Sequence, residues 1–438
     1  MQPPGTGVHP ITAWLKRTNA LSFTLYASAA SFCLYLCIFS IRKTFGVATY
    51  EGLTYWGIDY KVLMITFQVI GYLISKFIGI KVVSEMKAGY RTLGILLMVS
   101  IATVSWLFFG LTPAPYNLVF LFFNGLPLGM VWSLVFGYLE GRKSTEVLGA
   151  SLSVSFIFAG GFGKTVGGLV MRDWGVSETW MPFVSAILFF VPMLLFLWLI
   201  DKLPPPTLED EALRTKRQPM SGKERMEFVR TFGFGLVMLI ASYALLTAYR
   251  EFRDNFSKEI WISLGYGDKP GIFTQTETPV SLTVLVAIAV LMVIKNNRKA
   301  LIINHLMVIF GMVLTGVSTF AFQRQLISGP VWMTLVGMGL YFGYIQFNSI
   351  FFDRLLAAFR YAGTVAFLIN LADSCGYVGS VGVLFYKNFG HANLSWLDFF
   401  ISVGYVLSVV GTVLMVASLL YFNKKYATWS GATENKPA

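Results

Sequence analysis

Residues 201–230 form the polar segment that divides the chain, and they read DKLPPPTLEDEALRTKRQPMSGKERMEFVR. Six apolar runs of membrane-spanning length lie before this segment and six lie after it. A helix needs about 20 residues to cross a bilayer, so a chain of 438 residues has room for about twelve crossings and for little else. The sequence therefore predicts an all-α polytopic membrane protein with twelve transmembrane helices in two halves of six.

The composition supports this prediction. Hydrophobic residues make up 55% of the chain and charged residues only 13%, whereas a soluble globular domain is about one-quarter charged. These figures exclude a soluble globular protein and a disordered one. The predicted spans cover residues 20–41, 60–79, 92–112, 117–139, 148–171, 181–200, 231–252, 279–294, 300–321, 330–352, 361–385 and 398–422.

The predicted loops differ in charge between the two sides of the membrane. Basic residues such as Lys16, Arg17 and Lys299 concentrate on the side that holds both termini. Because basic loops stay in the cytoplasm, we expect both termini to be cytoplasmic in a multi-pass protein of the bacterial inner (plasma) membrane. Topology thus explains the net charge of +12, and no nucleic-acid partner is expected. The expected parts are a tail 1–19, a bundle 20–200, a cytoplasmic linker 201–230, a bundle 231–422 and a tail 423–438.

The two halves resemble each other in sequence. Residues 42–45 (Arg-Lys-Thr-Phe) fall on residues 253–256 (Arg-Asp-Asn-Phe) with a shift of 211 residues. Three glycines also align with a shift of 214 residues, Gly125, Gly129 and Gly149 with Gly339, Gly343 and Gly363. Glycine recurs in any membrane protein because it lets helices approach closely, and this is the alternative explanation. The match favours two parallel repeats, a layout typical of major-facilitator carriers, which bind substrate at the midplane between two rocking halves.

Polar and ionisable side chains inside the apolar runs are candidate site residues, because a charge at bilayer depth costs several kcal/mol unless it is paired or hydrated. In the first half they are Tyr35, Arg42 and Lys43 in the first span, Tyr72 and Lys76 in the second, and Lys164 in the fifth. In the second half they are Arg250 and Arg253 in the seventh span, Glu277 at the start of the eighth, and Asn370 and Asp373 in the eleventh.

Several interpretations of these residues stay open. The repeat favours Arg253 as the counterpart of Arg42, whereas depth in the apolar run favours Arg250. Arg42, Lys43 and both second-half arginines could instead lie at the non-cytoplasmic helix ends and extend to the lipid headgroups. Asp373 is either an acid that couples transport to a cation or proton, or a counter-ion that limits repulsion in a basic cavity.

The cations indicate the chemical class of the solute. Cations that converge on a low-dielectric cavity attract an anion with several acceptor oxygens. Arginine presents a planar fork that matches carboxylate or phosphate, so we expect a small anionic solute, an organic phosphate or a dicarboxylate. The three histidines, His9, His305 and His391, lie in separate regions, and the sequence has no metal or nucleophile motif. We therefore expect no enzymatic activity, no metal and no cofactor.

Two motifs resemble one branch of the major facilitator superfamily. Residues 41–45 (IRKTF) and 71–79 (GYLISKFIG) resemble the opening of organophosphate:phosphate antiporters, which exchange glycerol-3-phosphate and sugar phosphates for phosphate. The chain is also similar to a family of bacterial major-facilitator-like membrane proteins from which no substrate follows. The resemblance implies phosphate binding by Arg42 and by Arg250 or Arg253, a contribution to the basic pocket from Lys43 and Lys76, and gating by Glu277.

The chain departs from that branch at two places. Residues 83–86 (Val-Ser-Glu-Met), between the second and third spans, keep an acid at Glu85 but have Met86 where the superfamily usually has arginine. This change weakens the usual charge lock between helices, so Glu85 is only a candidate gating residue. The branch's fifth-helix histidine has no equivalent, since residues 158–161 read Phe-Ala-Gly-Gly. Lys164, one turn further on, either substitutes for it or serves another anion.

Together these features predict a secondary active transporter of an organic anion, most specifically an organophosphate/phosphate exchanger. We expect it to work by alternating access in the lipid bilayer as a functional monomer, because both halves of the pathway lie in one chain. The alternative is a non-transporting membrane sensor or assembly partner that keeps a carrier fold. The short linker and tails contain no obvious output domain, which favours transport.

Overall fold

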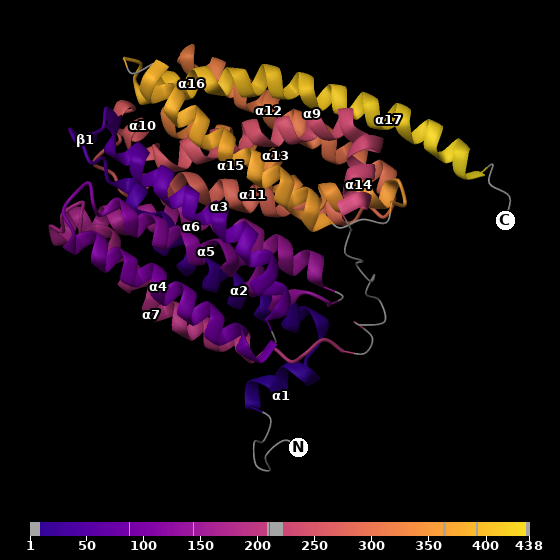
Figure 1. Ribbon diagram of the computed structural model, residues 1–438, viewed down its shortest axis with the longest axis horizontal. Coiled ribbons are helices and arrows are strands. Elements are labelled where there is room, and N and C mark those ends of the chain that lie inside the picture. The colour runs from indigo at the N-terminus through magenta and orange to yellow at the C-terminus, as the bar shows by residue number, and fades with distance from the viewer. Residues whose placement is uncertain are drawn as a thin grey trace.

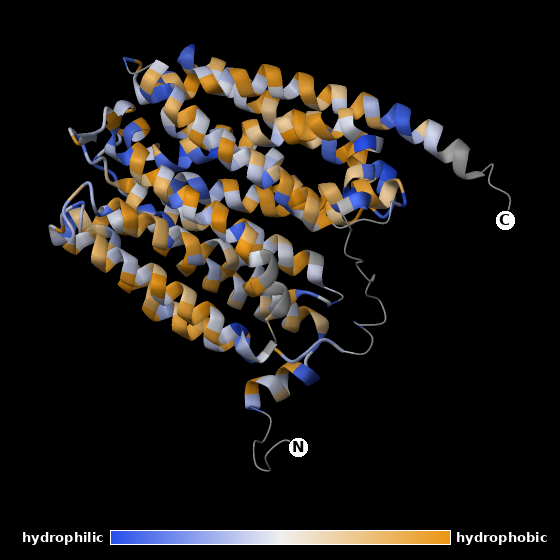
Figure 2. Ribbon diagram, in the orientation of Figure 1, coloured by the Kyte–Doolittle hydropathy of each residue, from blue (hydrophilic) through white to orange (hydrophobic). Residues whose placement is uncertain are grey.

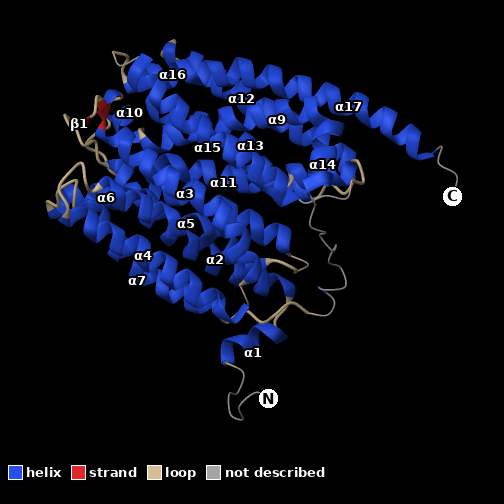
Figure 3. Ribbon diagram, in the orientation of Figure 1, coloured by secondary structure: helices blue, strands red, loops and turns tan. Residues whose placement is uncertain are grey.

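The structure is a computed structural model that describes residues 9–86, 88–142, 144–207, 210, 222–361, 365–390 and 393–434. Of the expected linker, residues 208–209 and 211–221 lie outside the described part. Figure 1 shows the helices side by side in two bundles, the first half below and the second above. Almost all of the described backbone is helical, and a short hairpin lies at one end (Figure 3).

The first half contains six long helices: α2 (Ala20–Lys43), α3 (Tyr60–Glu85), α4 (Arg91–Leu111), α5 (Leu118–Leu139), α6 (Thr145–Trp174) and α7 (Met181–Asp201). Short elements connect or precede them: α1 (Pro10–Arg17), the 3₁₀ helices η1 (Thr44–Val47) and η2 (Ala88–Tyr90), and the antiparallel strands β1 (Thr54–Tyr55) and β2 (Ile58–Asp59). In the hairpin Thr54 pairs with Asp59 and Tyr55 with Ile58.

The second half follows the same order with longer and broken helices. It contains α9 (Gly222–Asn255), α10 (Ser257–Ser263), α11 (Ile272–Met292), α12 (Asn297–Gln323), α13 (Gly329–Ser349), α14 (Phe351–Ala358) and α15 (Val365–Gly390). The last span runs from α16 (Trp396–Val406) through the π-helical turn η3 (Leu407–Gly411) into α17 (Thr412–Glu434).

The number of spans agrees with the prediction. Among the described residues 11 helices are long and apolar enough to cross a membrane, and the pair α13 and α14, bent by 52°, makes 12 if it counts as one span. Apolar residues dominate these helices, while hydrophilic residues gather at the ends of the bundle and at points inside it (Figure 2). The predicted twelve-helix, all-α fold is therefore confirmed.

Two helices begin earlier than the apolar runs predict. Helix α9 begins at Gly222 instead of residue 231, and α11 begins at Ile272 instead of 279. Most of the residues that the prediction left out of α11 are polar, and two of them, Thr276 and Glu277, face protein. Hydropathy marks lipid-facing surface, so it misses polar turns that pack against a neighbouring helix. Glu277 consequently lies inside α11, in its second turn, and not at its start.

The aligned glycines serve close helix contacts that differ between the halves. A Cβ atom at Gly125 on α5 would lie 2.2 Å from the backbone oxygen of Gln68 on α3. A Cβ atom at Gly339 on α13 would lie 2.4 Å from the backbone oxygen of Gly311 on α12. Each glycine allows two helices to approach, but the partner is the second helix in one half and the third in the other. The glycine alignment therefore reflects a general packing requirement.

The end that carries β1 and α10 lies opposite the end where α1 and the last turns of α17 lie (Figure 1). At this end η1 of the first half contacts α9 and α10 of the second. Helix α6 packs against α11 and helix α3 against α15. The consecutive residues Cys37–Ala48 and Leu246–Ser257 are all buried, so the final turns of α2 and α9 are enclosed on every side. Nearer the chain termini both helices regain exposed positions, for example Leu25 and Phe234.

Candidate functional site

The candidate site begins with the basic ends of α2 and α9. Arg42, Lys43, Arg250 and Arg253 lie in or near the last turns of these helices and are only 2–5% exposed. A helix C-terminus favours cations, because its unpaired carbonyl groups carry partial negative charge. The interpretation that these four residues extend to the lipid headgroups is wrong, since each is enclosed where the halves meet.

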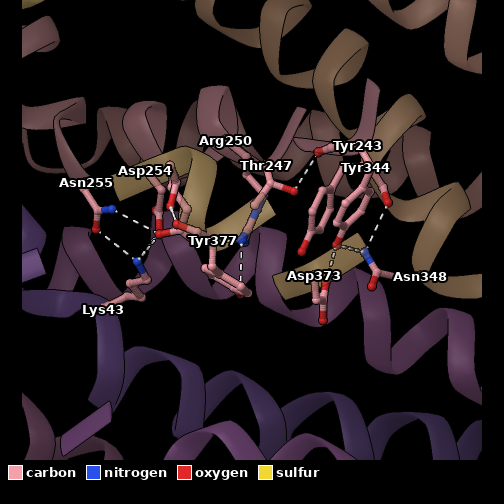
Figure 4. Close-up of polar contacts among 12 residues, drawn as sticks. Lys43, Tyr243, Thr247, Arg250, Asp254, Asn255, Tyr344, Asn348, Asp373 and Tyr377 are labelled. Carbon is pink, nitrogen blue, oxygen red and sulfur yellow. Dashed lines mark hydrogen bonds and ion pairs between the residues drawn. The ribbon is translucent and has the colours of Figure 1, made fainter. Parts of the chain in front are cut away.

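Lys43 connects the two halves directly. Its Nζ atom lies 2.9 Å from Glu251 Oε2, 3.0 Å from Asn255 Oδ1 and 3.6 Å from Asp254 Oδ2, all on α9 (Figure 4). Asn255 donates its own amide hydrogen to the same Glu251 oxygen at 3.1 Å. These hydrogen bonds offset part of the cost of burying the charged pair.

Three further lysines of the first half repeat this arrangement. Lys164 on α6 pairs with Asp254, Lys61 on α3 pairs with Glu259 on α10, and Lys76 on α3 lies 3.3 Å from Asp373 on α15. Lys61 also donates to the backbone oxygen of Gly46 at 3.0 Å. In every one of these pairs the lysine comes from the first half and the carboxylate from the second.

Arg42 differs from these lysines. Its guanidinium lies 3.9 Å from the centre of the Tyr72 ring, and within the described part of the chain no carboxylate pairs with it. The Nε and Nη2 atoms of Arg42 are buried and have no hydrogen-bond partner. A buried donor without a partner costs about 1–3 kcal/mol, more when it is charged, so such a group is poised to bind an acceptor.

The structure separates the roles of Arg250 and Arg253. Arg250 donates to Glu251 at 2.6 Å and to the Tyr377 hydroxyl at 3.4 Å, its guanidinium lies 4.3 Å from the centre of the Tyr344 ring, and its Nε has no partner. Since Tyr377 packs on Tyr72 with ring centroids 5.0 Å apart, Arg250 and Arg42 share one aromatic neighbourhood.

Arg253 turns away from this neighbourhood. It pairs with Glu277 on α11 at 2.7 Å and donates to the backbone oxygen of Met333 at 3.0 Å. It remains the counterpart of Arg42 in the sequence repeat, but Arg250 is the arginine that the fold brings beside Arg42.

Asp373 on α15 contacts a helix of each half. One carboxylate oxygen accepts a hydrogen bond from Tyr243, which also accepts one from Asn348 at 3.1 Å, and the other faces Lys76 (Figure 4). Asn370 lies one turn before Asp373 and is partly exposed. Tyr35, two turns before Arg42, is 8% exposed and packs against Phe39. The side chain of Glu85 lies outside the described residues.

The sequence prediction missed several of these residues. Lys61 and Glu259 lie at span ends, where a charge looks like a loop residue, and Glu251 lies between two arginines. A signal for Asp254 was present, because the repeat aligns it with Lys43, a residue of opposite charge. We call the resulting set of buried or partly buried charges the interface charge cluster: Arg42, Lys43, Lys61, Lys76, Lys164, Arg250, Arg253, Glu251, Asp254, Glu259, Glu277 and Asp373.

The interface charge cluster is not balanced. It contains seven cations and five carboxylates, so with every group ionised it carries an excess of two positive charges. Within the described residues no group of three or more His, Cys, Asp or Glu side chains is arranged to hold a metal ion. Two negative charges would neutralise this excess.

A family model described as "Family of unknown function (DUF5690)" matches residues 44–425. The chain belongs to this family. No curated protein sequence matches this DUF5690 member. The match contains most of the interface charge cluster but begins just after Arg42 and Lys43.

Solved structures similar to this DUF5690 protein are transporters. A peptide transporter in complex with sulfate aligns over 97% of this chain and 99% of its own, with a TM-score of 0.63 and 11% identity. A D-xylose–proton symporter aligns over 91% and 97%, with a TM-score of 0.58 and 17% identity. A nucleoside transporter aligns over 89% and 99%, with a TM-score of 0.58 and 12% identity. The DUF5690 protein thus has the twelve-helix fold of major-facilitator transporters.

Proposed function

We propose that this DUF5690 protein is a secondary transporter that moves a small organic anion across the membrane by alternating access. The observation that carries the proposal is Arg42: a buried arginine between the halves that has, among the described residues, no carboxylate partner and two unpaired donor atoms. Arg250 supplies a third unpaired donor in the same aromatic neighbourhood. Two arginine forks that converge in this way suit the oxygens of a phosphate or carboxylate.

The charge excess narrows the class of anion. Two negative charges would balance the interface charge cluster, and a phosphate monoester or a dicarboxylate carries two at neutral pH. The most specific form of the proposal is organophosphate/phosphate exchange, as the sequence resemblance implies. Exchange also follows from electrostatics, because like charges repel in the empty site and an anion relieves the repulsion before the halves move.

The contacts between the halves support an alternating mechanism. Lys43, Lys61 and Lys164 hold the halves together at the end that carries β1 and α10. We propose that the anion enters from the opposite side, which holds the chain termini. We assign that side to the cytoplasm, in line with the basic loops. Transport then requires these lysine pairs to separate while contacts form at the opposite end.

Three further residues are proposed to couple binding to this motion. Asp373 touches Lys76 of the other half, so it is placed to sense whether an anion occupies the site. Glu277 holds Arg253 while its Oε2 atom has no partner, and it faces Gly161 of α6, where the halves touch. Asn370 lies one turn from Asp373 on the partly exposed side of α15.

Counterflow in proteoliposomes tests the proposal. The full chain is reconstituted with internal phosphate, and uptake of labelled phosphate is measured with and without external glycerol phosphate or succinate as competitor. We expect uptake that needs internal anion and that Arg42→Gln reduces by about 100-fold, because charge-assisted hydrogen bonds contribute about 1.5–3 kcal/mol each. Arg172→Gln is the matched control, since Arg172 is exposed and pairs only with the adjacent Asp173 among described partners.

Two outcomes would contradict the proposal. Uptake that is equal in Arg42→Gln and Arg172→Gln would remove Arg42 from the site. Saturable anion binding without any flux would show a sensor with a carrier fold and not a transporter.

A further inference from the structure

Aromatic side chains line the neighbourhood of Arg42 and Arg250. Four come from α2, α6 and α13, and we call them the α13 wall: Tyr35, Phe39, Phe156 and Tyr344. Phe156 packs on Phe39 with ring centroids 5.9 Å apart and on Tyr344 with centroids 6.1 Å apart at an interplanar angle of 87°. The rings therefore form one continuous surface that crosses from the first half of the chain to the second.

A second pair of rings comes from α3 and α15. Tyr72 and Tyr377, the α15 wall, pack with ring centroids 5.0 Å apart and also connect the two halves. Each wall holds one arginine: Arg42 lies over Tyr72, and Arg250 lies over Tyr344 while reaching the Tyr377 hydroxyl. Figure 4 shows Arg250 directed toward Tyr377, with Tyr344 beside it. Both anion-binding groups are thus framed by aromatic rings.

These rings keep a small uncovered surface. Tyr35, Phe39, Tyr72 and Tyr344 remain 5–8% exposed, and Phe156 is only partly buried. Tyr243, stacked on Tyr344, is 1% exposed and represents a ring that protein atoms cover fully. Tyr377, the other ring of the α15 wall, is 3% exposed. The two walls thus place aromatic rings beside the unpaired donors of both arginines.

We infer that the transported anion carries a planar aromatic or heteroaromatic ring, which packs between the α13 wall and the α15 wall while its acidic group binds Arg42 and Arg250. The inference rests on the proposed function and names the substrate class for the same site. A ring gains from edge-to-face and offset contacts with Tyr and Phe beyond what its buried area supplies. A flexible polyol makes no such ring contacts. The site therefore discriminates between anions of equal charge by the group that carries the charge, a ring or a polyol chain.

Matched probes test the inference on the purified full chain. Phenyl phosphate and glycerol phosphate carry the same acidic group on a ring and on a polyol, and phthalate and succinate repeat the comparison for dicarboxylates. Affinities are measured by titration calorimetry in detergent. Within whichever pair binds, we expect the ring compound to bind at least about tenfold more tightly than its partner without a ring. Equal affinities within the pair would overturn the ring inference and leave the anion carrier standing.

Variants show whether the walls cause the preference. Phe156→Leu should reduce the ratio of ring to polyol affinity to about threefold or less, because it removes one face of the α13 wall and keeps an apolar side chain. Phe120→Leu is the control: Phe120 stacks on Phe108 between α5 and α4, away from the site. An unchanged ratio in Phe156→Leu would overturn the assignment of the ring to this wall. Failure of all four probes to bind would overturn the proposed function as well.

Discussion

The Nζ atom of Lys76 lies 3.3 Å from Oδ2 of Asp373, and this pair joins α3 of one half to α15 of the other beside the proposed anion site. The Nζ atom of Lys76 also lies 5.2 Å from the centre of the Tyr72 ring, over which the Arg42 guanidinium lies. Its side chain is 21% exposed, whereas those of Lys43, Lys61 and Lys164 are 1–5% exposed. Lys76 is therefore the lysine that an arriving anion can share with its carboxylate partner.

Asp373→Asn should raise the affinity for the anion. The substitution frees Lys76 and increases the positive charge of the site, while the amide can still bond to Tyr243. We expect an increase of about fivefold, which corresponds to a charge pair of about 1 kcal/mol in a partly exposed setting. The measurement is titration of the purified protein with phosphate or succinate. Asp173→Asn is the control, because Asp173 is exposed at the end of α6. Weaker binding in Asp373→Asn would show that Asp373 does not compete with the anion.

The two arginines of α9 should respond differently to the same change. Arg250→Gln should lower anion affinity by about 100-fold with little loss of stability, because Glu251 keeps Lys43 and Asn255 as partners. Arg253→Gln should instead lower stability by about 3–5 kcal/mol, since it leaves Glu277 buried without its partner. Melting temperatures and calorimetric affinities are measured on both variants.

A double variant provides the control for this pair. Arg253→Gln combined with Glu277→Gln should recover most of the lost stability, because no unpaired charge remains. If Arg253→Gln abolished anion binding at full stability, the assignment of Arg250 as the partner of Arg42 would be reversed.

Closure at the end that carries β1 and α10 should depend on pH through Glu259. Burial raises the pKa of this carboxyl group above its usual 4.5 although Lys61 lies beside it. The closed form thus binds a proton more tightly than an open form in which Glu259 meets water. Closure should strengthen as pH falls from the raised pKa toward 4.5 and weaken as pH rises through the same window.

Cysteine labelling measures this closure. Ser257→Cys is introduced after Cys33, Cys37 and Cys375 are replaced, since Ser257 is the first residue of α10 and is only 5% exposed. The labelling rate, divided at each pH by that of the denatured chain, should fall several-fold on acidification and become independent of pH in Glu259→Gln. A pH dependence that persists in Glu259→Gln would assign it to another group.

Hydropathy alone determined the architecture of this protein. A run of about 20 apolar residues can satisfy its backbone hydrogen bonds in lipid only as a helix, so each span follows from its own local sequence. The same reasoning makes Arg42, Lys76 and Lys164 conspicuous, because a charge within such a run is expensive wherever the helix packs. The start of α11 was missed for the same reason, since its first polar turns face α6 and not lipid.

Only the tertiary structure decided which charges meet. Lys43 forms an ion pair with Glu251, 208 residues later in the sequence, and Lys61 with Glu259, 198 residues later. The choice between Arg250 and Arg253 depended on which side of α9 faces α15 and which faces α11, and no local pattern carries that information. Pairing energies fall with distance, so these pairs contribute only once the two halves have packed together. The sequence determined that buried cations need partners, and the packing of the halves left Arg42 without one.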